Sequence, residues 1–266
     1  MKKLTIDINA YCNEKCRFCY QSLDGTVLPE ERILEIIDEN PDAKTIGIGG
    51  GEPFLDKRII EFIRHIHDRE RNVHISTNAT IIPENLLALE EKARKRTQIQ
   101  VSLHASNPAL YEQITGRSLF DRVIGNIKTL KDYFPTLITS AIYEDNFNDV
   151  QNIVNLAERL DLPLRINLVF PEGKGKYVGR LNQKQIDQLR GYLLGQRVLK
   201  GNKIESSLIH KNNCIAIGKS YGIKKESKCP LDYGKTYVSP NGSVSGCEFY
   251  RCPISRLEEN LTGGDN

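Results

Sequence analysis

The chain has 266 residues, of which 39% are hydrophobic and 27% are charged, a composition that suits a folded globular protein and excludes a largely disordered chain. Its formal net charge of +3 is too small to predict nucleic-acid binding across the surface, and no apolar run is long enough to cross a bilayer. The first residues, Met1 to Asp7, lack the apolar core of a signal peptide, so we expect a cytoplasmic protein without membrane or nucleic-acid partners.

Short apolar runs alternate with amphipathic stretches over residues 1–199, which we expect to form one domain. The runs predict strands at residues 4–8, 45–48, 73–76, 99–103, 137–142 and 164–169. The amphipathic stretches predict helices near residues 30–38, 57–69, 84–96, 108–114, 120–133, 149–160 and 182–194. Six strand–helix repeats predict an α/β fold, in which parallel strands with right-handed crossovers form a partial (β/α)6 barrel of the TIM type.

Three cysteines follow the first predicted strand in the run Tyr-Cys-Asn-Glu-Lys-Cys-Arg-Phe-Cys-Tyr; they are Cys12, Cys16 and Cys19. Three thiolates can bind three irons of a cubane cluster and leave the fourth iron open to a small molecule, with Phe18 shielding one face. A zinc site is the alternative, although structural zinc usually takes four protein ligands and this run supplies three. The run falls at the C-terminal end of a strand, where parallel strand–helix folds place their active sites.

A glycine-rich turn, Gly49-Gly50-Gly51-Glu52-Pro53, ends the second predicted strand. Glycine lets the backbone approach a ligand closely, and a carboxylate such as that of Glu52 accepts hydrogen bonds from an ammonium group. Alone, the run predicts only a turn. Beside the three-cysteine loop, it predicts an edge that binds an amino acid.

Together these two motifs resemble the radical S-adenosylmethionine (SAM) superfamily, which combines C-x3-C-x2-C after its first strand with GGEP after its second. Ser76-Thr77-Asn78-Ala79 resembles the family's Thr-Asn-Gly segment, with alanine in place of glycine. Val101-Ser102-Leu103-His104 ends the fourth strand, where related enzymes place polar groups near SAM. Thr115-Gly116-Arg117 resembles the family's Arg-Gly segment in reversed order.

The resemblance implies a [4Fe-4S] cluster on the three cysteines, whose open iron binds the amino and carboxylate groups of SAM. The other residues that it places at the cofactor are Phe18, Gly50, Gly51, Glu52, Thr77, Asn78 and Ser102. Of these, Glu52 and the backbone at Gly50 and Gly51 would hold the SAM amino group. The reduced cluster would pass one electron to the sulfonium, and the resulting 5′-deoxyadenosyl radical would abstract a hydrogen atom from a substrate.

The pattern fixes no catalytic side chain, and the candidates are His104, Arg165, Cys214 and Cys252. His104 lies near the end of the fourth strand and could face the substrate. Arg165 shares one face of the sixth strand with Asn167 by the period-two rule, so both could contact SAM or substrate. A polar layer inside the barrel is the alternative for that face.

Residues 200–266 predict a small second domain rich in cysteine, with a hairpin whose turn is Ser239-Pro240-Asn241-Gly242. Cys229 and Cys247 flank the hairpin, and Cys214 and Cys252 complete a set of four thiols. Such a set can hold an iron–sulfur cluster or a structural zinc ion. A third possibility leaves one iron open, with Cys214 or Cys252 free to donate a hydrogen atom to a substrate radical.

This region resembles the SPASM and twitch extensions of radical SAM enzymes, which begin C-x9–15-G-x4-C and carry auxiliary iron–sulfur clusters. Cys229, Gly242 and Cys247 fit that spacing, and no cysteine follows Cys252 in the sequence. The resemblance therefore implies one auxiliary [4Fe-4S] cluster on Cys214, Cys229, Cys247 and Cys252, as in a twitch domain. Lysines outnumber acidic residues over residues 200–228, so we expect this segment to dock an acidic electron donor such as flavodoxin or ferredoxin.

The leading hypothesis is a radical SAM enzyme that modifies a peptide or protein side chain, a peptide maturase. No peptide-recognition module is expected before the first strand, so a separate recognition protein could take that part. The second hypothesis is a small-molecule dehydrogenase or oxidoreductase that uses the auxiliary cluster as electron acceptor. The third is a non-catalytic iron–sulfur or zinc protein that senses redox state or scaffolds a partner.

Overall fold

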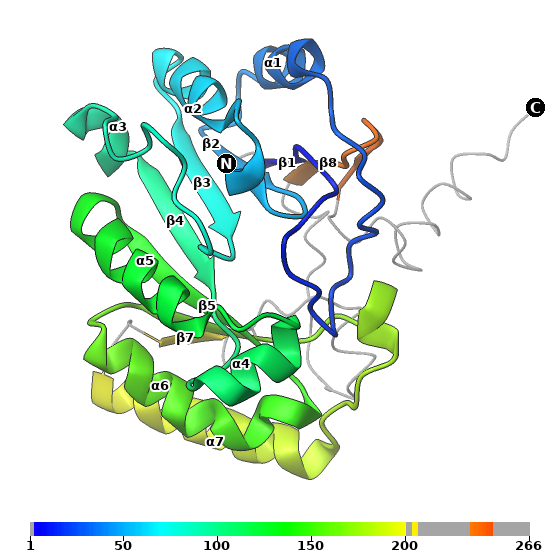
Figure 1. The fold of residues 1–266 in the computed structure, drawn as a ribbon, viewed down its shortest axis with the longest axis vertical. Coiled ribbons are helices and arrows are strands. Elements are labelled where there is room, and N and C mark those ends of the chain that lie inside the picture. Colours follow the sequence, from blue (N-terminus) through cyan, green and yellow to red (C-terminus); the bar gives the residue numbers. More distant parts are fainter. Residues whose placement is uncertain (1–2, 201–203, 207–234, 247–266) are drawn as a thin grey trace, which may run out of the picture.

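The structure is a computed structural model that describes residues 3–200, 204–206 and 235–246. These residues form a curved sheet with helices along its outer side (Figure 1). The four C-terminal cysteines, Cys214, Cys229, Cys247 and Cys252, lie outside the described residues, as does most of the lysine-rich segment. The auxiliary cluster and its ligands therefore stay a prediction.

Among the described residues, nine strands form one sheet in the order β7-β6-β5-β4-β3-β2-β1-β8-β9. Every neighbouring pair is parallel except β8 and β9, which are antiparallel. The strands are β1 (Lys3–Asp7), β2 (Thr45–Gly49), β3 (Asn72–Thr77), β4 (Thr97–Ser102), β5 (Thr136–Ile142), β6 (Leu164–Leu168), β7 (Ile204–Ser206), β8 (Lys235–Val238) and β9 (Val244–Ser245).

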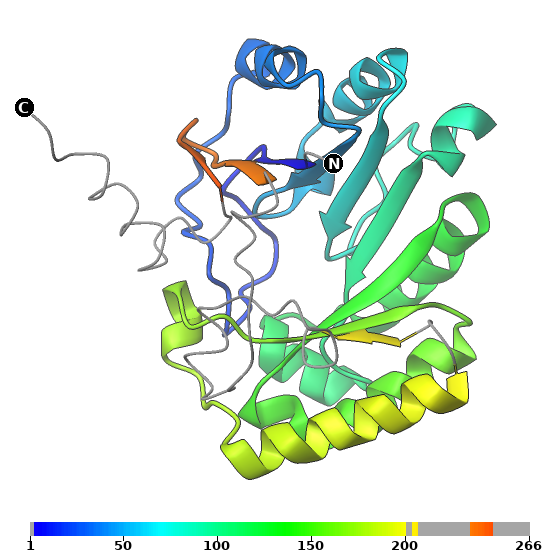
Figure 2. The ribbon, with the colours of Figure 1, turned by 180° about the vertical axis from the view of Figure 1, so that it is seen from behind.

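The helices cover the convex side of the sheet, as the two opposite views in Figures 1 and 2 show. They are α1 (Glu30–Glu39), α2 (Ile59–Asp68), α3 (Glu91–Lys95), α4 (Pro108–Thr115), α5 (Phe120–Tyr133), α6 (Val150–Arg159) and α7 (Gln183–Lys200). Short 3-10 turns are η1 (Pro53–Leu55), η2 (Glu144–Asp149) and η3 (Gly173–Lys176). Within the described ranges, no helix combines the length and apolar composition that a membrane span needs.

The strands have an apolar outer face and a polar inner face. On β1, Leu4 and Ile6 are each 1% exposed and belong to the hydrophobic core, whereas Thr5 between them lines an inner cavity. His74 on β3 and Gln100 on β4 line the same cavity. Because successive side chains of a strand point to opposite faces, the core lies between sheet and helices and leaves the concave side for polar chemistry.

The predicted α/β fold is confirmed, since strands β1 to β6 occupy the predicted positions and neighbour one another in chain order. The predicted helix over residues 84–96 is wrong in its first half, because α3 begins only at Glu91. Asn85 has a left-handed φ of 67°, which is incompatible with a continuous helix. Leu86 and Leu89, whose spacing imitates a helical face, are buried by consecutive turns instead.

Both described parts of the chain after residue 199 extend the same sheet. Strand β7 pairs with β6, and β8 pairs with β1, so the hairpin lies beside the first strand (Figure 2). The hairpin itself is confirmed, with Gly242 at a φ of 83° in its turn. Strand β7 was not predicted, because its three residues contain a single apolar side chain, Ile204. The division into two domains at residue 199 stays a prediction.

Candidate functional site

A cavity of about 520 Å³ lies on the concave side of the sheet and is lined by β1 to β6 and the loops that follow β1, β2, β3, β4 and β6. This volume is within the range of about 300–1,000 Å³ that is usual for ligand pockets. The structure brings every candidate site residue that it describes to this cavity: Cys12, Cys16, Phe18, Cys19, Gly50, Gly51, Glu52, Thr77, Asn78, Ser102, His104 and Arg165.

The cysteine loop, residues 12–19, is held in place by its backbone. The amides of Lys15 and Arg17 donate hydrogen bonds to carbonyls of the last turn of α4, at 2.8 and 3.0 Å. The guanidinium Nε of Arg117 donates to the carbonyl of Asn13 at 2.8 Å. The segment that resembled the family's Arg-Gly run therefore fixes the outer side of the cysteine loop.

The glycine-rich turn fixes the inner side of the same loop. The amides of Gly51 and Glu52 donate to the carbonyls of Asn9 and Tyr11 at 2.9 and 2.8 Å. Gly50 has a φ of 130°, and a Cβ on it would lie 2.4 Å from the carbonyl oxygen of Asn9. In the structure these glycines admit the backbone of Asn9 and Tyr11, directly before the cysteine loop, and they also line the cavity; their contact with SAM stays a prediction.

The carboxylate of Glu52 is buried, with 1% exposure, and joins the ends of β2 and β3. It accepts hydrogen bonds from the Phe54 amide at 2.9 Å, the Thr77 hydroxyl at 2.6 Å and the Asn78 amide at 2.7 Å. Burial raises the pKa of Glu52 to about 7, against the lowering effect of these donors. Because a carboxylate offers about four acceptor positions, one remains for a donor in the cavity.

Asn78 connects the end of β3 to the cysteine loop. Its side-chain amide donates to the side-chain oxygen of Asn13 at 2.9 Å and to the sulfur of Cys12 at 3.6 Å. Asn13 in turn donates to the hydroxyl of Thr80 at 2.7 Å. Hydrogen bonds to a thiolate tune the reduction potential of a cluster that the thiolate binds. From its position beside Cys12, Asn78 can tune the potential of such a cluster.

Glu14 and Tyr111 form a contact at the cysteine loop that the sequence did not predict. The carboxyl group of Glu14 is buried, with 4% exposure, and accepts a hydrogen bond from the Tyr111 hydroxyl. The thiol of Cys16 donates to the other oxygen of Glu14 at 3.5 Å. Burial raises the pKa of Glu14. In the sequence, a glutamate between two cysteines resembles an ordinary solvated residue, so no local signal predicts this contact.

The three thiols fit a cluster better than a single ion. Burial raises the pKa of each thiol, that of Cys12 to about 12, while the Glu14 amide, 3.4 Å from the Cys12 sulfur, favours its thiolate. Among residues 3–200, 204–206 and 235–246, no three metal-ligating side chains lie close enough to hold one ion. Three thiols that face one cavity without converging suit a cluster in which each thiolate binds a different iron.

His104 and Arg165 lie at the cavity in different surroundings. Nδ1 of His104 accepts a hydrogen bond from the Ala141 amide at 3.0 Å, so the ring proton is on Nε2, and burial lowers the pKa to about 4. The ring of Phe18 meets the His104 ring edge-on at 4.7 Å. Arg165 donates to the side-chain oxygen of Gln100 at 2.9 Å, within a polar layer on the inner face of the sheet.

Asp7 is a further cavity residue that the sequence did not single out. Its carboxylate is 3% exposed and accepts hydrogen bonds from the Tyr237 hydroxyl at 2.6 Å and from the side-chain amide of Gln21. These contacts join the C-terminal hairpin to the segment that follows Cys19. No local signal in the sequence singles out Asp7, because β1 also contains the polar residues Lys3 and Thr5.

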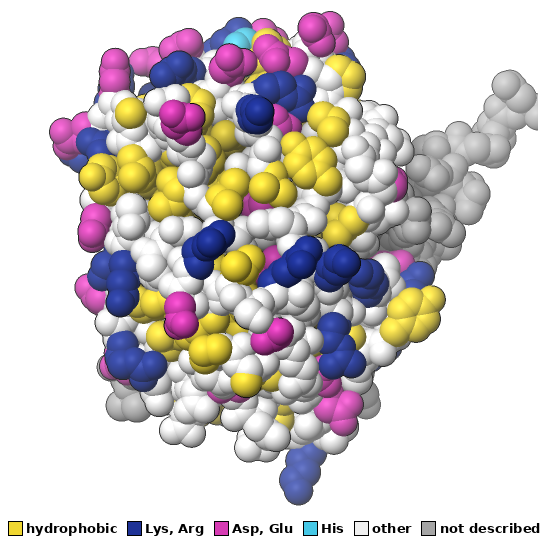
Figure 3. Space-filling model, in the orientation of Figure 1, with side chains coloured by type: hydrophobic (Ala, Val, Ile, Leu, Met, Phe, Trp, Pro, Cys, Tyr) yellow, Lys and Arg dark blue, Asp and Glu magenta, His cyan; other side chains and the backbone are white. Residues whose placement is uncertain are grey.

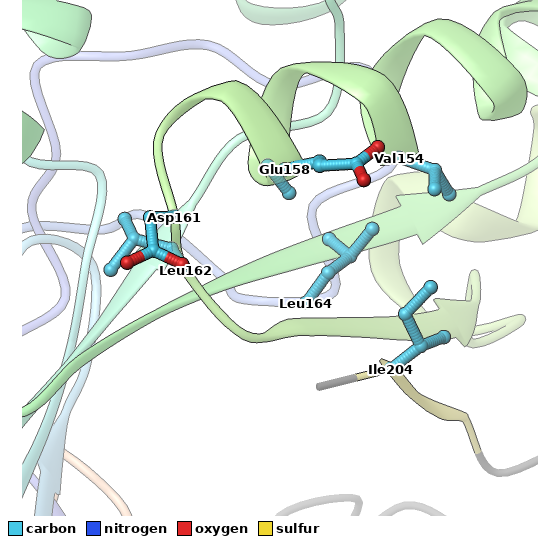
Figure 4. Close-up of a pocket in the computed structure, with 7 residues that line it drawn as sticks. Val154, Glu158, Asp161, Leu162, Leu164 and Ile204 are labelled. Atoms are coloured by element: carbon cyan, nitrogen blue, oxygen red, sulfur yellow. The ribbon is translucent and has the colours of Figure 1, made fainter. Parts of the chain in front are cut away.

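A smaller cavity of about 270 Å³ lies between α6 and the strands β6 and β7 (Figure 4). It is lined by Val154, Ala157, Glu158, Asp161, Leu162, Leu164 and Ile204. This described lining contains no cysteine, histidine or basic side chain and shares no residue with the larger cavity. The candidate site is therefore the larger cavity.

The fold and the cavity define a partial-barrel protein with an N-terminal cysteine loop beside the cavity on its concave side. The sequence profile described as the Radical SAM superfamily matches residues 6–157. The chain belongs to the radical SAM superfamily, whose members are enzymes. Membership implies a [4Fe-4S] cluster and SAM.

Two curated relatives differ in how much of this chain they match. A protein described as a probable GTP 3′,8-cyclase from Saccharolobus islandicus is 30% identical over 199 residues, which are 71% of this chain and 63% of that protein. The mycofactocin maturase MftC from Mycolicibacterium smegmatis is 27% identical over 273 residues, which are 98% of this chain and 66% of MftC. The chain therefore spans about two thirds of the length of these relatives.

Solved structures support the fold. Streptococcus suis SuiB, in a crystal structure with its precursor peptide SuiA, matches with a TM-score of 0.78 and 17% identity, over 94% of this chain and 60% of SuiB. Native anSMEcpe with bound AdoMet matches with a TM-score of 0.71 and 19% identity, over 94% of this chain and 76% of anSMEcpe. At such identities the likeness concerns the fold alone.

Proposed function

We propose that this protein cleaves SAM reductively in the larger cavity and acts on a peptide or protein side chain. One observation carries the proposal: the cysteine loop, the glycine-rich turn and the Thr77-Asn78 strand end meet around one cavity and are joined by hydrogen bonds. When bound, the cluster and SAM supply a 5′-deoxyadenosyl radical that removes a hydrogen atom from the substrate.

The residues of the cavity have separate tasks in this proposal. Cys12, Cys16 and Cys19 would each hold one iron. The remaining acceptor position of Glu52 would bind the SAM ammonium group, with the carboxylate oriented by its three internal donors. Ser102, at the end of β4, would donate to the SAM carboxylate.

Phe18 and His104 would shape the other side of the cavity. The Phe18 ring packs on His104 and lies 5.5 Å from the ring of Tyr143, a position from which it would shield the cysteine loop from water. His104 stays neutral at ordinary pH because its pKa is lowered to about 4. It would therefore offer a fixed Nε2–H donor to a substrate and not act as a proton acceptor.

A peptide substrate is supported by the extent of the matches. The match to the maturase MftC spans 98% of this chain, whereas the match to the probable GTP 3′,8-cyclase spans 71%. The SuiB structure that resembles this fold contains a precursor peptide. We extend the proposal to one auxiliary [4Fe-4S] cluster on the four C-terminal cysteines, which would accept an electron from a substrate radical.

A small molecule is the second candidate substrate, for dehydrogenase or oxidoreductase chemistry. It is favoured by the polar inner face of the cavity, to which β3, β4 and β6 contribute His74, Gln100, Arg165 and Asn167. The 30% identity to a probable GTP 3′,8-cyclase points the same way. A non-catalytic iron–sulfur or zinc protein is the third candidate.

Anaerobic reconstitution tests these alternatives. We expect about eight irons for each chain with both clusters, and 5′-deoxyadenosine when dithionite and SAM are added. Cys16→Ala is expected to abolish SAM cleavage, and Lys15→Ala, an exposed neighbour in the same loop, to leave it unchanged. Zinc without iron, or iron without SAM cleavage, would contradict the proposal. Deuterium transfer into 5′-deoxyadenosine from a labelled peptide or from labelled GTP separates the two substrate classes.

A further inference from the structure

The outer side of the cysteine loop carries a group of basic side chains that the proposed chemistry does not use. Five of them are exposed, and we call them the basic rim: Lys15, Arg17, Arg117, Lys174 and Lys176. They come from three segments that are far apart in the sequence, namely the loop after β1, the end of α4 and η3.

The basic rim lies directly against the proposed cluster ligands. Lys15 and Arg17 alternate with the cysteines in the sequence, and Arg117 holds a carbonyl of the same loop at 2.8 Å. The backbone amide of Lys174 donates to the carbonyl of Cys19 at 2.9 Å, and its charge favours the thiolate of Cys19. A partner bound at the rim would therefore be separated from the cysteines by little more than the loop itself.

The rim keeps an excess of positive charge. Arg17 pairs with Asp145 at 2.8 Å and Lys176 pairs with Glu172 at 3.0 Å, and the two carboxylates are less exposed than their partners. Among the described residues, the side chains of Lys15, Arg117 and Lys174 form no ion pair within 4.0 Å, although the charge of Arg117 acts on the buried carboxyl of Glu14. Five cations against two carboxylates give an excess of three, as large as the formal charge of the whole chain, +3.

The surface view shows the same concentration. Lys and Arg side chains gather across the middle of the face in Figure 3, over the region where the loop after β1, α4 and η3 lie in Figure 1. Tyr177, directly after the last rim lysine, is 87% exposed. Exposed tyrosine beside basic side chains is common in protein–protein interfaces, where an aromatic ring adds contact area at low entropic cost.

We propose that the basic rim is the docking site for an acidic one-electron carrier protein that reduces the cluster on Cys12, Cys16 and Cys19. In this step the carrier loses one electron and the cluster gains one, and no bond forms or breaks. The inference rests on the proposed function, because it needs a reducible cluster. The sequence analysis placed such docking on residues 200–228, most of which lie outside the described residues, so that expectation stays a prediction; the rim consists of other residues, next to the proposed cluster ligands.

The experiment tests the docking site through the salt dependence of electrostatic steering. Complementary charge raises association rates by about 10- to 1,000-fold and does so less at high salt. We would reconstitute the full chain and measure SAM cleavage with reduced flavodoxin and, separately, with dithionite. The test variant is Lys15→Glu with Lys176→Glu. The matched control is Lys44→Glu, an exposed lysine before β2, at the opposite end of the strands from the cysteine loop.

With reduced flavodoxin at low salt, we expect the double variant to cleave SAM about tenfold more slowly than the wild type and to lose most of its salt dependence. With dithionite, both proteins are expected to cleave SAM at the same rate, and Lys44→Glu to match the wild type with both donors. Unchanged flavodoxin-driven cleavage would overturn the docking site. So would an equal loss with both donors. A wild type that fails with dithionite would refute the proposed function instead.

Discussion

Gly51 lies so close to Tyr11 that a Cβ on the glycine would be 2.1 Å from the carbonyl oxygen of Tyr11 and 2.8 Å from its backbone nitrogen. The same carbonyl accepts the amide of Glu52 at 2.8 Å. The residue directly before Cys12 is therefore locked to the glycine-rich turn by a contact that leaves no room for a side chain. The position of the first cysteine depends on this contact.

Gly51→Ala is expected to displace the start of the cysteine loop, because the methyl group would meet backbone atoms that have no alternative rotamer. We expect a loss of stability of about 1–3 kcal/mol and a clear fall in iron content after reconstitution. Gly125→Ala is the control, since a Cβ there meets no atom within 4 Å. In helix α5 it is expected to stabilise by about 0.5–1 kcal/mol. Urea unfolding and iron analysis measure both; equal iron content in the two variants would contradict the prediction.

Glu52→Gln is expected to weaken both the fold and SAM binding. The glutamine amide would turn a donor toward groups that already donate, namely the Phe54 and Asn78 amides and the Thr77 hydroxyl. Leaving such a buried group unsatisfied costs about 1–3 kcal/mol. We expect at least about a tenfold increase in the Kd for SAM, from loss of a charged acceptor. Glu61→Gln, exposed on α2, is the control; unchanged SAM affinity in Glu52→Gln would remove Glu52 from the binding site.

Much of the fold could be predicted because its pattern is local. Alternation such as Leu4-Thr5-Ile6 identifies a strand and its buried face without any knowledge of the partners. The Asn241-Gly242 turn identifies the hairpin in the same way. The order of parallel strands then follows from right-handed crossovers. The cysteine loop and the glycine-rich turn could be placed at one edge because both follow neighbouring strands.

The contacts that hold the site together could not be predicted, because their partners are distant in the sequence. Glu14 and Tyr111 are separated by 97 residues, and Asp7 and Tyr237 by 230. Neither pair produces a local sequence pattern, since each acidic residue alone resembles an ordinary solvated residue. The partners of the amides of Gly51 and Glu52 were hidden for the same reason. Only the folded backbone shows that these donors are used inside the protein.

His104 gives the fold a pH dependence with a defined sign. Its folded-state pKa is lowered to about 4 from an ordinary 6.5, so the stabilisation is present above pH 6.5 and is lost as the pH falls toward 4. This lowering of the His104 pKa corresponds to about 3 kcal/mol. We expect the difference in unfolding free energy between wild type and His104→Gln to shrink by up to that amount between pH 6.5 and 4.

Equilibrium urea unfolding at several pH values measures this difference, with His65→Gln as the control at a histidine on the outer helix α2. Because burial lowers the pKa of His104 to about 4, SAM cleavage is also expected to show no His104 titration between pH 6 and 8. A constant difference between wild type and His104→Gln over the acid range would contradict the burial of a neutral ring against the Ala141 amide.

Tyr237→Phe tests the link between the C-terminal hairpin and the cluster site. The hydroxyl of Tyr237, which is 1% exposed, donates to the buried carboxylate of Asp7 at 2.6 Å, and Gln21 donates to the same carboxylate. Removing one donor from a buried acid costs about 1–3 kcal/mol, so we expect that loss in unfolding free energy. We also expect faster amide hydrogen exchange in β1, which pairs with β8.

Tyr177→Phe is the matched control, because the Tyr177 side chain is 87% exposed and removal of its hydroxyl leaves no buried group without a partner. We expect its unfolding free energy and its exchange in β1 to equal those of the wild type. The backbone of Gln21 also accepts a hydrogen bond from the Cys19 thiol at 4.0 Å, so the contact at Asp7 continues to a cluster ligand. A change in the spectrum of the reconstituted cluster in Tyr237→Phe but not in Tyr177→Phe would therefore support coupling between hairpin and cysteine loop. Identical unfolding and exchange in the two variants would show that the Tyr237 hydroxyl contributes nothing to holding β1.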